Sequence, residues 1–368
     1  MNYKVFTSES VAAGHPDKIC DQISDAIVDA ALSQDSYSKV AVETLVTKNQ
    51  VVLAGEVTSK ANLDYKKITS SVIKDLGYTN GLFGFSDKSP IFVKIHEQSP
   101  EISVGVDSGG AGDQGMMFGF AINETPTLMP LPISIAHALT EKLDRVREKK
   151  DLPYLRPDGK SEVTVTYDGG KPKAVERVIL AAAHNEKIDN QQLKGDLYRY
   201  VVKPVLAKFG FKLSKKDLVV NGAGVWHIPG PTSDTGVTGR KIIVDSYGAF
   251  ARAGGGAFSG KDPTKVDRSG AYAARFIAKN IVAAGLADKA EVQIAYVIGK
   301  KNPVAFSIET FGSEKKKLAT VEDFAKGLID LSVAGILNTL NLRRPIYQRT
   351  AQYGHFGRDD FPWEEVKN

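Results

Sequence analysis

Two segments of the chain combine glycine with charged side chains in a way that suits anion binding. Gly14-His15-Pro16-Asp17-Lys18 places an imidazole, a carboxylate and an ammonium at the start of an expected helix, where free backbone N–H groups attract anions. Gly255 to Asp262 (GGAFSGKD) fits a phosphate-binding loop, except that Asp262 replaces the expected magnesium-binding hydroxyl. Pro263 can open a helix that leaves Lys261 at its positive end. Both segments could hold a metal-bound phosphate, and both could also be ordinary helix starts.

A third glycine motif, Gly110 to Gly115 (GAGDQG), has the spacing of a dinucleotide-binding loop. Such a loop needs a helix after it and an acidic residue about twenty positions further on. Met116 to Ile122 instead predicts a strand, and positions 130 to 138 hold no acid. This motif therefore leaves an NAD-dependent oxidoreductase only as an alternative function.

Other basic residues also stand beside glycine. Two further examples are Asp158-Gly159-Lys160 and Thr238-Gly239-Arg240-Lys241. Each basic residue alone would be taken as an ordinary surface charge, but several such loops together suit one large anionic ligand. Asp21, Asp25 and Asp29 follow Asp17 at four-residue steps, which is typical of a solvated helix face. The chain has no Ser-His-Asp order, H-E-x-x-H or G-x-S-x-G motif, which disfavours a hydrolytic nucleophile.

The composition is that of a folded globular protein of two to three domains, with 368 residues, 42% hydrophobic and 25% charged. The net charge of +5 is mild, and a basic stripe interleaved with aromatic residues is missing, so a nucleic-acid-binding protein is a weak alternative. Cys20 is the single cysteine, which excludes an internal disulfide. We see neither a signal peptide nor a membrane-spanning stretch, and we expect a cytoplasmic protein without membrane or nucleic-acid partners.

Apolar periodicity and turn residues predict the elements that must position these motifs. A helix should begin at Pro16, hairpins should form from residues 40–46 with 51–57 and 162–167 with 174–183, and a strand should cover Ile242 to Val244. Further helices are expected at Pro132–Lys149, Asn190–Phe209, Pro263–Ala284 and Val321–Leu340. Because hairpins imply antiparallel pairing, the expected fold class is α+β with more than one sheet.

The short motifs lie within longer runs. FTSESV at Phe6 to Val11 leads into Gly14 to Lys18 and then DQISDA, while GAGDQGMMFG covers residues 110–119. GGGAFSGKDPTK covers residues 254–265 and is followed by VDRS, and the chain ends with YGHFGR and FPWE. In this order, and over nearly the whole chain, the runs resemble the methionine adenosyltransferases, also called S-adenosylmethionine synthetases.

The resemblance implies three interlocked domains of mixed and antiparallel sheet with helices and approximate threefold internal similarity. We place these domains at residues 1–99, 109–227 and 228–368. It also implies that ATP, L-methionine and water give S-adenosylmethionine, phosphate and diphosphate. The methionine sulfur attacks the ribose C5′ with a free lone pair, and water then hydrolyses the released triphosphate to phosphate and diphosphate. The demanding step is to stabilise the departing triphosphate. Homodimers with shared active sites, paired as tetramers, are implied, with two Mg²⁺ per active site and one K⁺ per subunit.

The family's functional residues can be carried over one by one. Catalytic roles are implied for His15, Lys160, Arg240, Lys261 and Lys265. ATP contacts are implied for His15, Asp158, Lys160, Val225, Trp226, Asp234, Arg240, Lys241, Ala257 and Lys261. Methionine contacts are implied for Glu56, Gln98, Asp113, Asp234 and Lys265. Asp17 and Asp267 would be the magnesium ligands and Glu43 the potassium ligand. Without the family, Glu43 and Glu56 would be taken as solvent-facing strand residues.

Two positions depart from the family pattern. Val225-Trp226 stands where relatives usually have Arg-Phe; Trp226 can stack on adenine, but Val225 cannot replace the arginine charge. We therefore expect weaker ATP binding that Trp226 partly restores. The segment from Ser99 to Gly109 is shorter than the mobile loop of many relatives, so we expect it to gate the site less completely.

Overall fold

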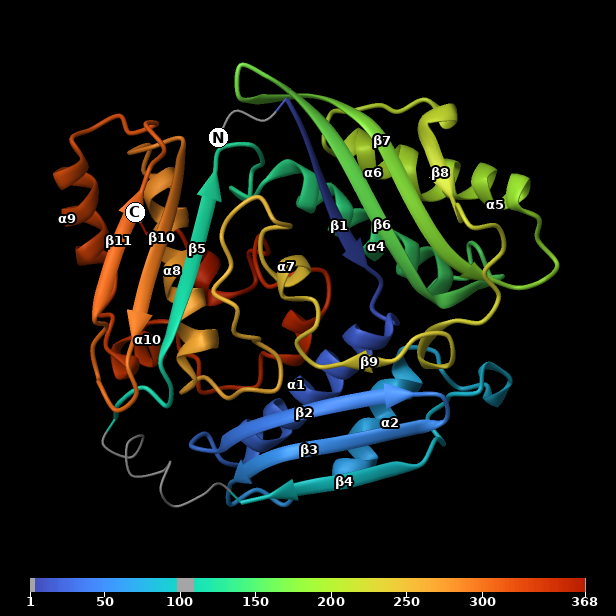
Figure 1. Cartoon of the computed structure of the whole chain (residues 1–368), viewed down its shortest axis with the longest axis horizontal. Helices are drawn as coiled ribbons and strands as arrows, with labels where there is room; N and C mark the ends of the chain where they lie inside the picture. The colour runs from blue at the N-terminus through green and yellow to red at the C-terminus, as the bar shows by residue number, and fades with distance from the viewer. Residues whose placement is uncertain (1–3, 98–108, 368) are drawn as a thin grey trace.

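The computed structural model describes residues 4–97 and 109–367 and arranges them as three sheets around a central loop region (Figure 1). The first sheet has the order β1(Val5–Val11)-β6(Leu155–Asp168)-β7(Lys171–His184)-β8(Leu218–Val220). The second has the order β4(Ile91–His96)-β3(Gln50–Thr58)-β2(Lys39–Thr47)-β9(Gly236–Val237). The third has the order β11(Ala305–Glu309)-β10(Lys289–Tyr296)-β5(Gly115–Ile122). Most pairs are antiparallel, while β3 with β4 and β7 with β8 are parallel.

The sheets exchange strands in a cycle. β1, from the start of the chain, pairs with β6 of the middle third. β5, from the middle third, pairs with β10 of the last third, and β9, from the last third, pairs with β2 of the first. Each sheet is thus completed by one strand from another part of the sequence, so the three parts are interlocked.

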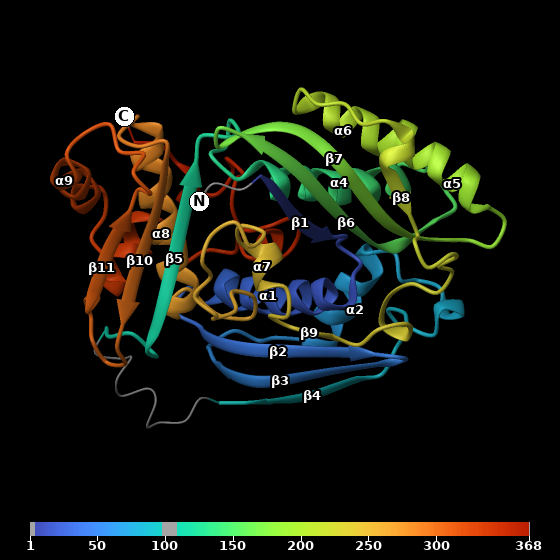
Figure 2. The same cartoon turned by 45° about the horizontal axis from the view of Figure 1, so that its top comes forward.

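One order of elements occurs three times along the chain. A strand that joins a distant sheet is followed by a long helix and then by a hairpin: β1, α1(Pro16–Gln34) and β2-β3; β5, α4(Leu131–Glu148) and β6-β7; β9, α8(Val266–Ala283) and β10-β11. Each long helix packs on the sheet of its own hairpin, α1 on β2, α4 on β6 and α8 on β10. Figure 2 shows α1 and α2(Tyr65–Asp75) on one face of the β2–β4 sheet, with the other face uncovered. This repeat agrees with threefold internal similarity.

The sequence predicted several elements correctly. α1 begins at Pro16, both expected hairpins form, and Met116–Ile122 lies within β5. The β6-β7 turn contains Gly169 and Gly170 with φ of 56° and 78°, values that favour glycine. The helical run from residue 190 is α5(Asn190–Leu197), a π-helical turn (Tyr198–Val202) and α6(Lys203–Lys208), and it ends at Gly210 as expected.

Three expectations were wrong in detail. Ile242–Val244 belongs to a short helix, α7(Ile242–Asp245), because no neighbouring strand pairs with it. The helix expected at Val321–Leu340 is divided into α9(Leu318–Leu328) and α10(Val333–Thr339), since Asp330 bonds Ser332, which caps a new helix. α8 begins at Val266, three residues later than Pro263, so Lys265 is its N-cap and not a first-turn residue.

The remaining described elements are single 3₁₀ turns at Gly81–Phe83, Lys215–Asp217, Gly230–Thr232, Gln348–Ala351 and Pro362–Glu364. Two fully buried ion pairs tie the parts together. Arg268 on α8 binds Asp25 on α1, and Arg275 on α8 binds Glu364 near the C-terminus and the carbonyl of Phe120 on β5. Among the helices in the described ranges, none is long and apolar enough to cross a membrane.

Candidate active site

The start of α1 carries the first of two clusters of candidate residues. His15 is 2% exposed, and its Nδ1 accepts a hydrogen bond from the backbone N of Asp17 at 3.2 Å. Because Nδ1 is the acceptor, the proton of the neutral ring is assigned to Nε2. Burial, and then the charges of Lys241 and Lys160, lowers the His15 pKa to about 3. The imidazole is therefore neutral near pH 7 and can donate a hydrogen bond from Nε2.

Asp17 is buried beside two cations. Lys241 Nζ lies 2.5 Å from Oδ2, Arg240 Nε lies 3.6 Å from Oδ1, and the backbone N of Val237 donates to Oδ1 at 3.0 Å. Burial acts to raise the pKa of Asp17, but the bonds from Lys241 and Val237 outweigh it and hold that pKa below its usual value. Asp17 is therefore a carboxylate whose charge is matched by the ammonium of Lys241.

β6 adds Asp158 and Lys160 to the same place. Asp158 Oδ2 accepts a hydrogen bond from the backbone N of Gly230 at 2.8 Å, while its buried Oδ1 has no hydrogen-bond partner in the described structure. Burial raises the pKa of Asp158 to about 8, against the opposing effects of the Gly230 bond and the Lys160 charge. Lys160 is exposed next to His15 and Asp158. The first cluster is defined as His15, Asp17, Asp158, Lys160, Arg240 and Lys241.

The second cluster lies at the start of α8. Lys261 Nζ is 2.5 Å from Asp267 Oδ2, with both side chains about one-fifth exposed. A Cβ at Gly256 would lie 2.3 Å from Asp267 Cγ, so only glycine allows the loop to approach this carboxylate. Burial and then the charge of Glu56 raise the pKa of Glu43 on β2. Lys261 is close enough to Glu43 for its positive charge to oppose this shift. The second cluster is defined as Glu43, Glu56, Lys261 and Asp267.

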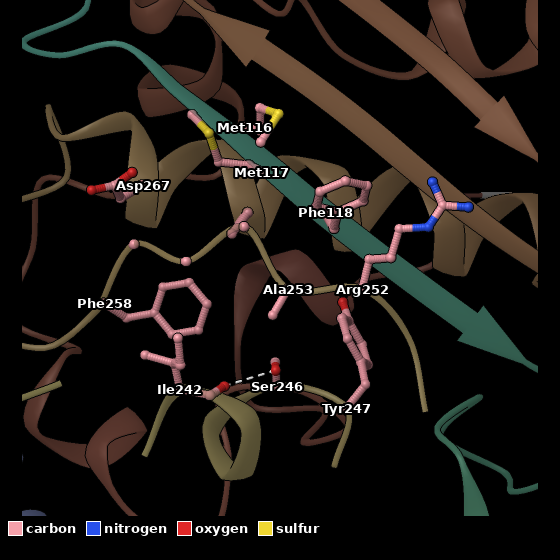
Figure 3. Close-up of a pocket in the computed structure, with 14 residues that line it drawn as sticks. Met116, Met117, Phe118, Ile242, Ser246, Tyr247, Arg252, Ala253, Phe258 and Asp267 are labelled. Atoms are coloured by element: carbon pink, nitrogen blue, oxygen red, sulfur yellow. Dashed lines mark hydrogen bonds between the residues drawn. The ribbon is translucent and has the colours of Figure 1, made fainter. Parts of the chain in front are cut away.

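A small hollow borders Asp267. It is enclosed by β5, by α7 and by the loop from Arg252 to Gly256, and Met117, Tyr247 and Phe258 point toward it (Figure 3). Its volume is about 20 Å³, which is room for about one water molecule. The hollow of about 830 Å³ between the β6-β7 turn and Phe209 contains none of the candidate residues. The hollow that borders Asp267 is therefore too small for ATP.

The two clusters lie at different points along α1. Asp17 is in its first turn, while Asp25, eight residues later, bonds the loop of Lys261, and eight helical residues span roughly 12 Å. Ala257, in the loop of Lys261, lies against Gly239, in the loop of Arg240 and Lys241. Lys265 bonds the buried Asp262 at 2.6 Å instead of an open site.

The other candidates lie at the borders. Val225 is 64% exposed, and Trp226 is held at the end of β7 because its carbonyl accepts from the backbone N of His184 at 3.0 Å. Asp113 and Asp234 are exposed. Gln98 and residues 99–108 of the shortened loop lie outside the described residues. Gly110–Gly115 leads into β5, so the helix that a dinucleotide-binding loop needs does not follow it.

The expectation of a solvated aspartate face on α1 was wrong. Asp21 and Asp25 are fully buried, and Asp29 is mostly buried. Each accepts hydrogen bonds from loops of the last third of the chain, so burial costs are offset by charge-assisted bonds. The four-residue spacing was visible in the sequence, but the partners are more than 200 residues away and gave no local signal.

The carboxylates suit magnesium. Within the described ranges, no three His, Cys, Asp or Glu side chains converge as a metal-binding group. Single carboxylates such as Asp17 and Asp267 fit a magnesium ion that takes most of its oxygens from phosphate and water. The carboxylate of Glu43 could bind a monovalent cation, but a single carboxylate does not specify which ion.

Comparisons with known proteins point to one family along the whole chain. The family model described as S-adenosylmethionine synthetase, N-terminal domain, matches residues 3–100; those of the central and C-terminal domains match residues 108–226 and 228–365. The chain is 49% identical over 383 residues to an S-adenosylmethionine synthase of Desulforudis audaxviator (strain MP104C), covering 100% of this chain and 97% of the relative. It is 48% identical over 388 residues to that of Clostridium tetani (strain Massachusetts / E88), covering 99% of each.

Proposed function

The chain belongs to the S-adenosylmethionine synthetase family and is a methionine adenosyltransferase, and we propose that its first and second clusters bind the polyphosphate of ATP. The reaction converts ATP, L-methionine and water into S-adenosylmethionine, phosphate and diphosphate. The enzyme is metal-dependent, as is general in this family. We assign the steps of this reaction to individual residues.

The observation that supports these assignments most is the pairing of Lys241 with Asp17 and of Lys261 with Asp267, each at 2.5 Å. In both pairs an ammonium suited to phosphate lies against a carboxylate suited to magnesium. We propose that substrate binding separates each pair, so that the lysines turn to the phosphates and Asp17 and Asp267 hold two Mg²⁺. The metal ions supply positive charge against the triphosphate as it leaves.

The side chains of the first cluster suit the step in which the sulfur attacks. Methionine sulfur carries no proton, so the site needs no general base; it needs donors aimed at the leaving triphosphate. His15 meets this need as a neutral donor from Nε2, because its pKa is lowered to about 3. Lys160, Arg240, Lys241 and Lys261 add fixed cations, and Lys265 would have to leave Asp262 to join them.

The same proposal covers the remaining substrate contacts. Trp226, with Val225 beside it, would cover the adenine, and Asp158, Asp234 and Ala257 would complete ATP binding. Methionine would contact Glu56, Gln98, Asp113, Asp234 and Lys265. One K⁺ per subunit would bind at Glu43, whose pKa is raised by burial and by the neighbouring charge of Glu56.

We further propose a homodimer with shared active sites, paired as a tetramer. Two features support it: the roughly 12 Å along α1 between Asp17 and Asp25, which bonds the loop of Lys261, and exposed apolar side chains near the second cluster, including Leu45 on β2 and Met116 on β5. A partner's first cluster facing this chain's second would make one complete site. Domains at residues 1–99, 109–227 and 228–368 and a cytoplasmic location belong to the same proposal.

The activity is tested by incubating the purified protein with ATP, methionine, Mg²⁺ and K⁺ and following all three products by mass spectrometry. Omission of methionine is the control. We expect S-adenosylmethionine, phosphate and diphosphate to form together and only with methionine. Folded, assembled protein that forms no sulfonium product would contradict the proposal.

A further inference from the structure

α1 presents four aspartates along one buried side, each bonded to the backbone of a distant loop. They stand at four-residue steps, which bring residues to the same face of a helix. The acceptor and donor pairs are Asp17 with Val237 N, Asp21 with Gly239 N, Asp25 with Gly260 N, and Asp29 with Tyr347 N and Gln348 N, at 2.8 to 3.0 Å. The first three donors come from the two loops that carry the cations of the clusters.

Asp21 fixes the loop of the first cluster. Its Oδ1 accepts from Gly239 N at 2.8 Å, and its Oδ2 accepts from the buried Lys18 at 2.9 Å, which also binds Asp245. Gly239 has a φ of 79° and directly precedes Arg240 and Lys241. The carboxylate of Asp21 therefore determines where these two cationic side chains leave the backbone.

Asp25 fixes the loop of the second cluster. It accepts from Gly260 N at 2.9 Å and from both terminal nitrogens of Arg268, at 2.6 and 2.8 Å. Arg268 in turn donates to the carbonyl of Lys261 at 2.9 Å. One buried ion pair thus holds the backbone N–H of Gly260, one residue before Lys261, and the carbonyl of Lys261 itself, so the side chain of Lys261 projects from a fixed backbone.

We propose that Asp21 and Asp25 are positioning residues that set the places of Arg240, Lys241 and Lys261 relative to α1, whose first turn carries His15 and Asp17. The inference rests on the proposed function, in which these cations bind the triphosphate. Charge-assisted bonds to backbone N–H groups are stronger than neutral ones, so a carboxylate holds a loop against thermal motion more firmly than an amide.

The test compares Asp21→Asn with Asp29→Asn, a matched control. Both residues lie on α1 and use both oxygens as acceptors, but Asp29 holds Tyr347 and Gln348, away from the cationic loops. Binding of inorganic tripolyphosphate is measured by calorimetry at fixed Mg²⁺, with the melting temperature and the KM and kcat for ATP. We expect Asp21→Asn to bind tripolyphosphate about tenfold more weakly and Asp29→Asn to remain within twofold. Equal effects of the two variants, or unchanged binding by folded Asp21→Asn, would overturn the proposal.

A measurement on the unmodified chain covers the case in which Asp21→Asn does not fold. Hydrogen exchange should show the amides of Gly239 and Gly260 protected, in contrast to Gly222 in an exposed loop. Exchange of Gly239 and Gly260 at the rate of Gly222 would show that the carboxylates do not hold the loops. Failure of the proposed function would instead appear as a lack of S-adenosylmethionine from the unmodified chain, whatever the exchange rates.

Discussion

The ammonium of Lys241 lies 2.5 Å from the carboxylate of Asp17, so each group occupies the position of the other's proposed ligand. A metal ion alone must compete with the lysine, and a polyphosphate alone must compete with the aspartate. Because each ligand frees the group that binds the other, the two should bind together more strongly than separately.

Replacing Lys241 with methionine separates these effects. Lys241→Met should bind Mg²⁺ alone a few-fold more tightly, since Asp17 loses its internal cation, but tripolyphosphate about tenfold or more weakly. Both affinities can be measured by calorimetry without turnover. Lys326→Met, which changes an exposed lysine on α9, is the control. A loss of both affinities in Lys241→Met would mean that the pair does not compete with its ligands.

His15 should act as a neutral hydrogen-bond donor. His15→Ala should lose about 10²- to 10³-fold in kcat, the usual cost of removing one such donor. His15→Gln should retain more, because its amide nitrogen can reach the place of Nε2. Since the His15 pKa is about 3, no loss of activity between pH 8 and pH 6 should arise from its protonation. An activity that depends on a group of pKa near 6.5, and loses that dependence in His15→Gln, would show that His15 titrates.

Asp158 should make the stability of the ligand-free protein depend on pH. Its pKa is about 8 in the folded chain and 3.8 without the fold, so the folded state keeps a proton that the unfolded state has lost. Stability therefore falls as the pH rises from about 4 to about 8. Asp158→Asn removes this dependence. The melting temperature of the variant minus that of the unmodified protein should therefore grow from pH 5 to pH 8 and then level off. A constant difference across pH 5 to 9 would contradict the assigned shift.

Trp226 should contribute a ring to ATP binding. Trp226→Ala should raise the KM for ATP about fivefold, as expected for the loss of one stacking contact. Trp226→Phe keeps a ring and should stay within about twofold, although it loses the bond from Nε1 to the Ile228 carbonyl. If Trp226→Ala leaves this KM unchanged, the stacking role is wrong.

A shared site should allow two inactive variants to restore each other. His15→Ala disables the first cluster and Lys261→Ala the second, so a mixed dimer contains one site with both mutations and one with neither. Activity should recover after subunit exchange, confirmed by mass spectrometry of differently tagged chains. Mixing two preparations of His15→Ala is the control. No recovery in confirmed mixed dimers would argue that each chain holds a complete site.

Local patterns predicted the local parts of the fold. The β2-β3 hairpin and α1 follow from apolar spacing and turn residues within a few positions of each other. The strand exchange could not be predicted in this way, because the partners of β1 and β9 lie far along the chain. α7 was mistaken for a strand because Ile242-Ile243-Val244 is β-branched, and the lack of a pairing partner overrode that preference.

The site was predictable to a similar degree. Glycines next to charged residues identified the loops of Lys241 and Lys261, and the resemblance to the methionine adenosyltransferases supplied the proposed roles of these two lysines. Neither source revealed that Asp21 is buried, because its partner Gly239 becomes a neighbour only when α1 packs against the last third of the chain. A polar face on a helix has the same sequence pattern whether it meets water or a backbone N–H group.

The cyclic exchange of strands has a consequence for the order in which the molecule forms during synthesis. The β2-β3-β4 sheet leaves the ribosome first, yet its edge strand β9 is made only after the whole middle part of the chain has been synthesised. β1 must likewise wait for β6, and β5 for β10. The sheet of the first part therefore cannot close until the last part has begun to be made, so its completion depends on a late, long-range contact of the kind that makes folding slow.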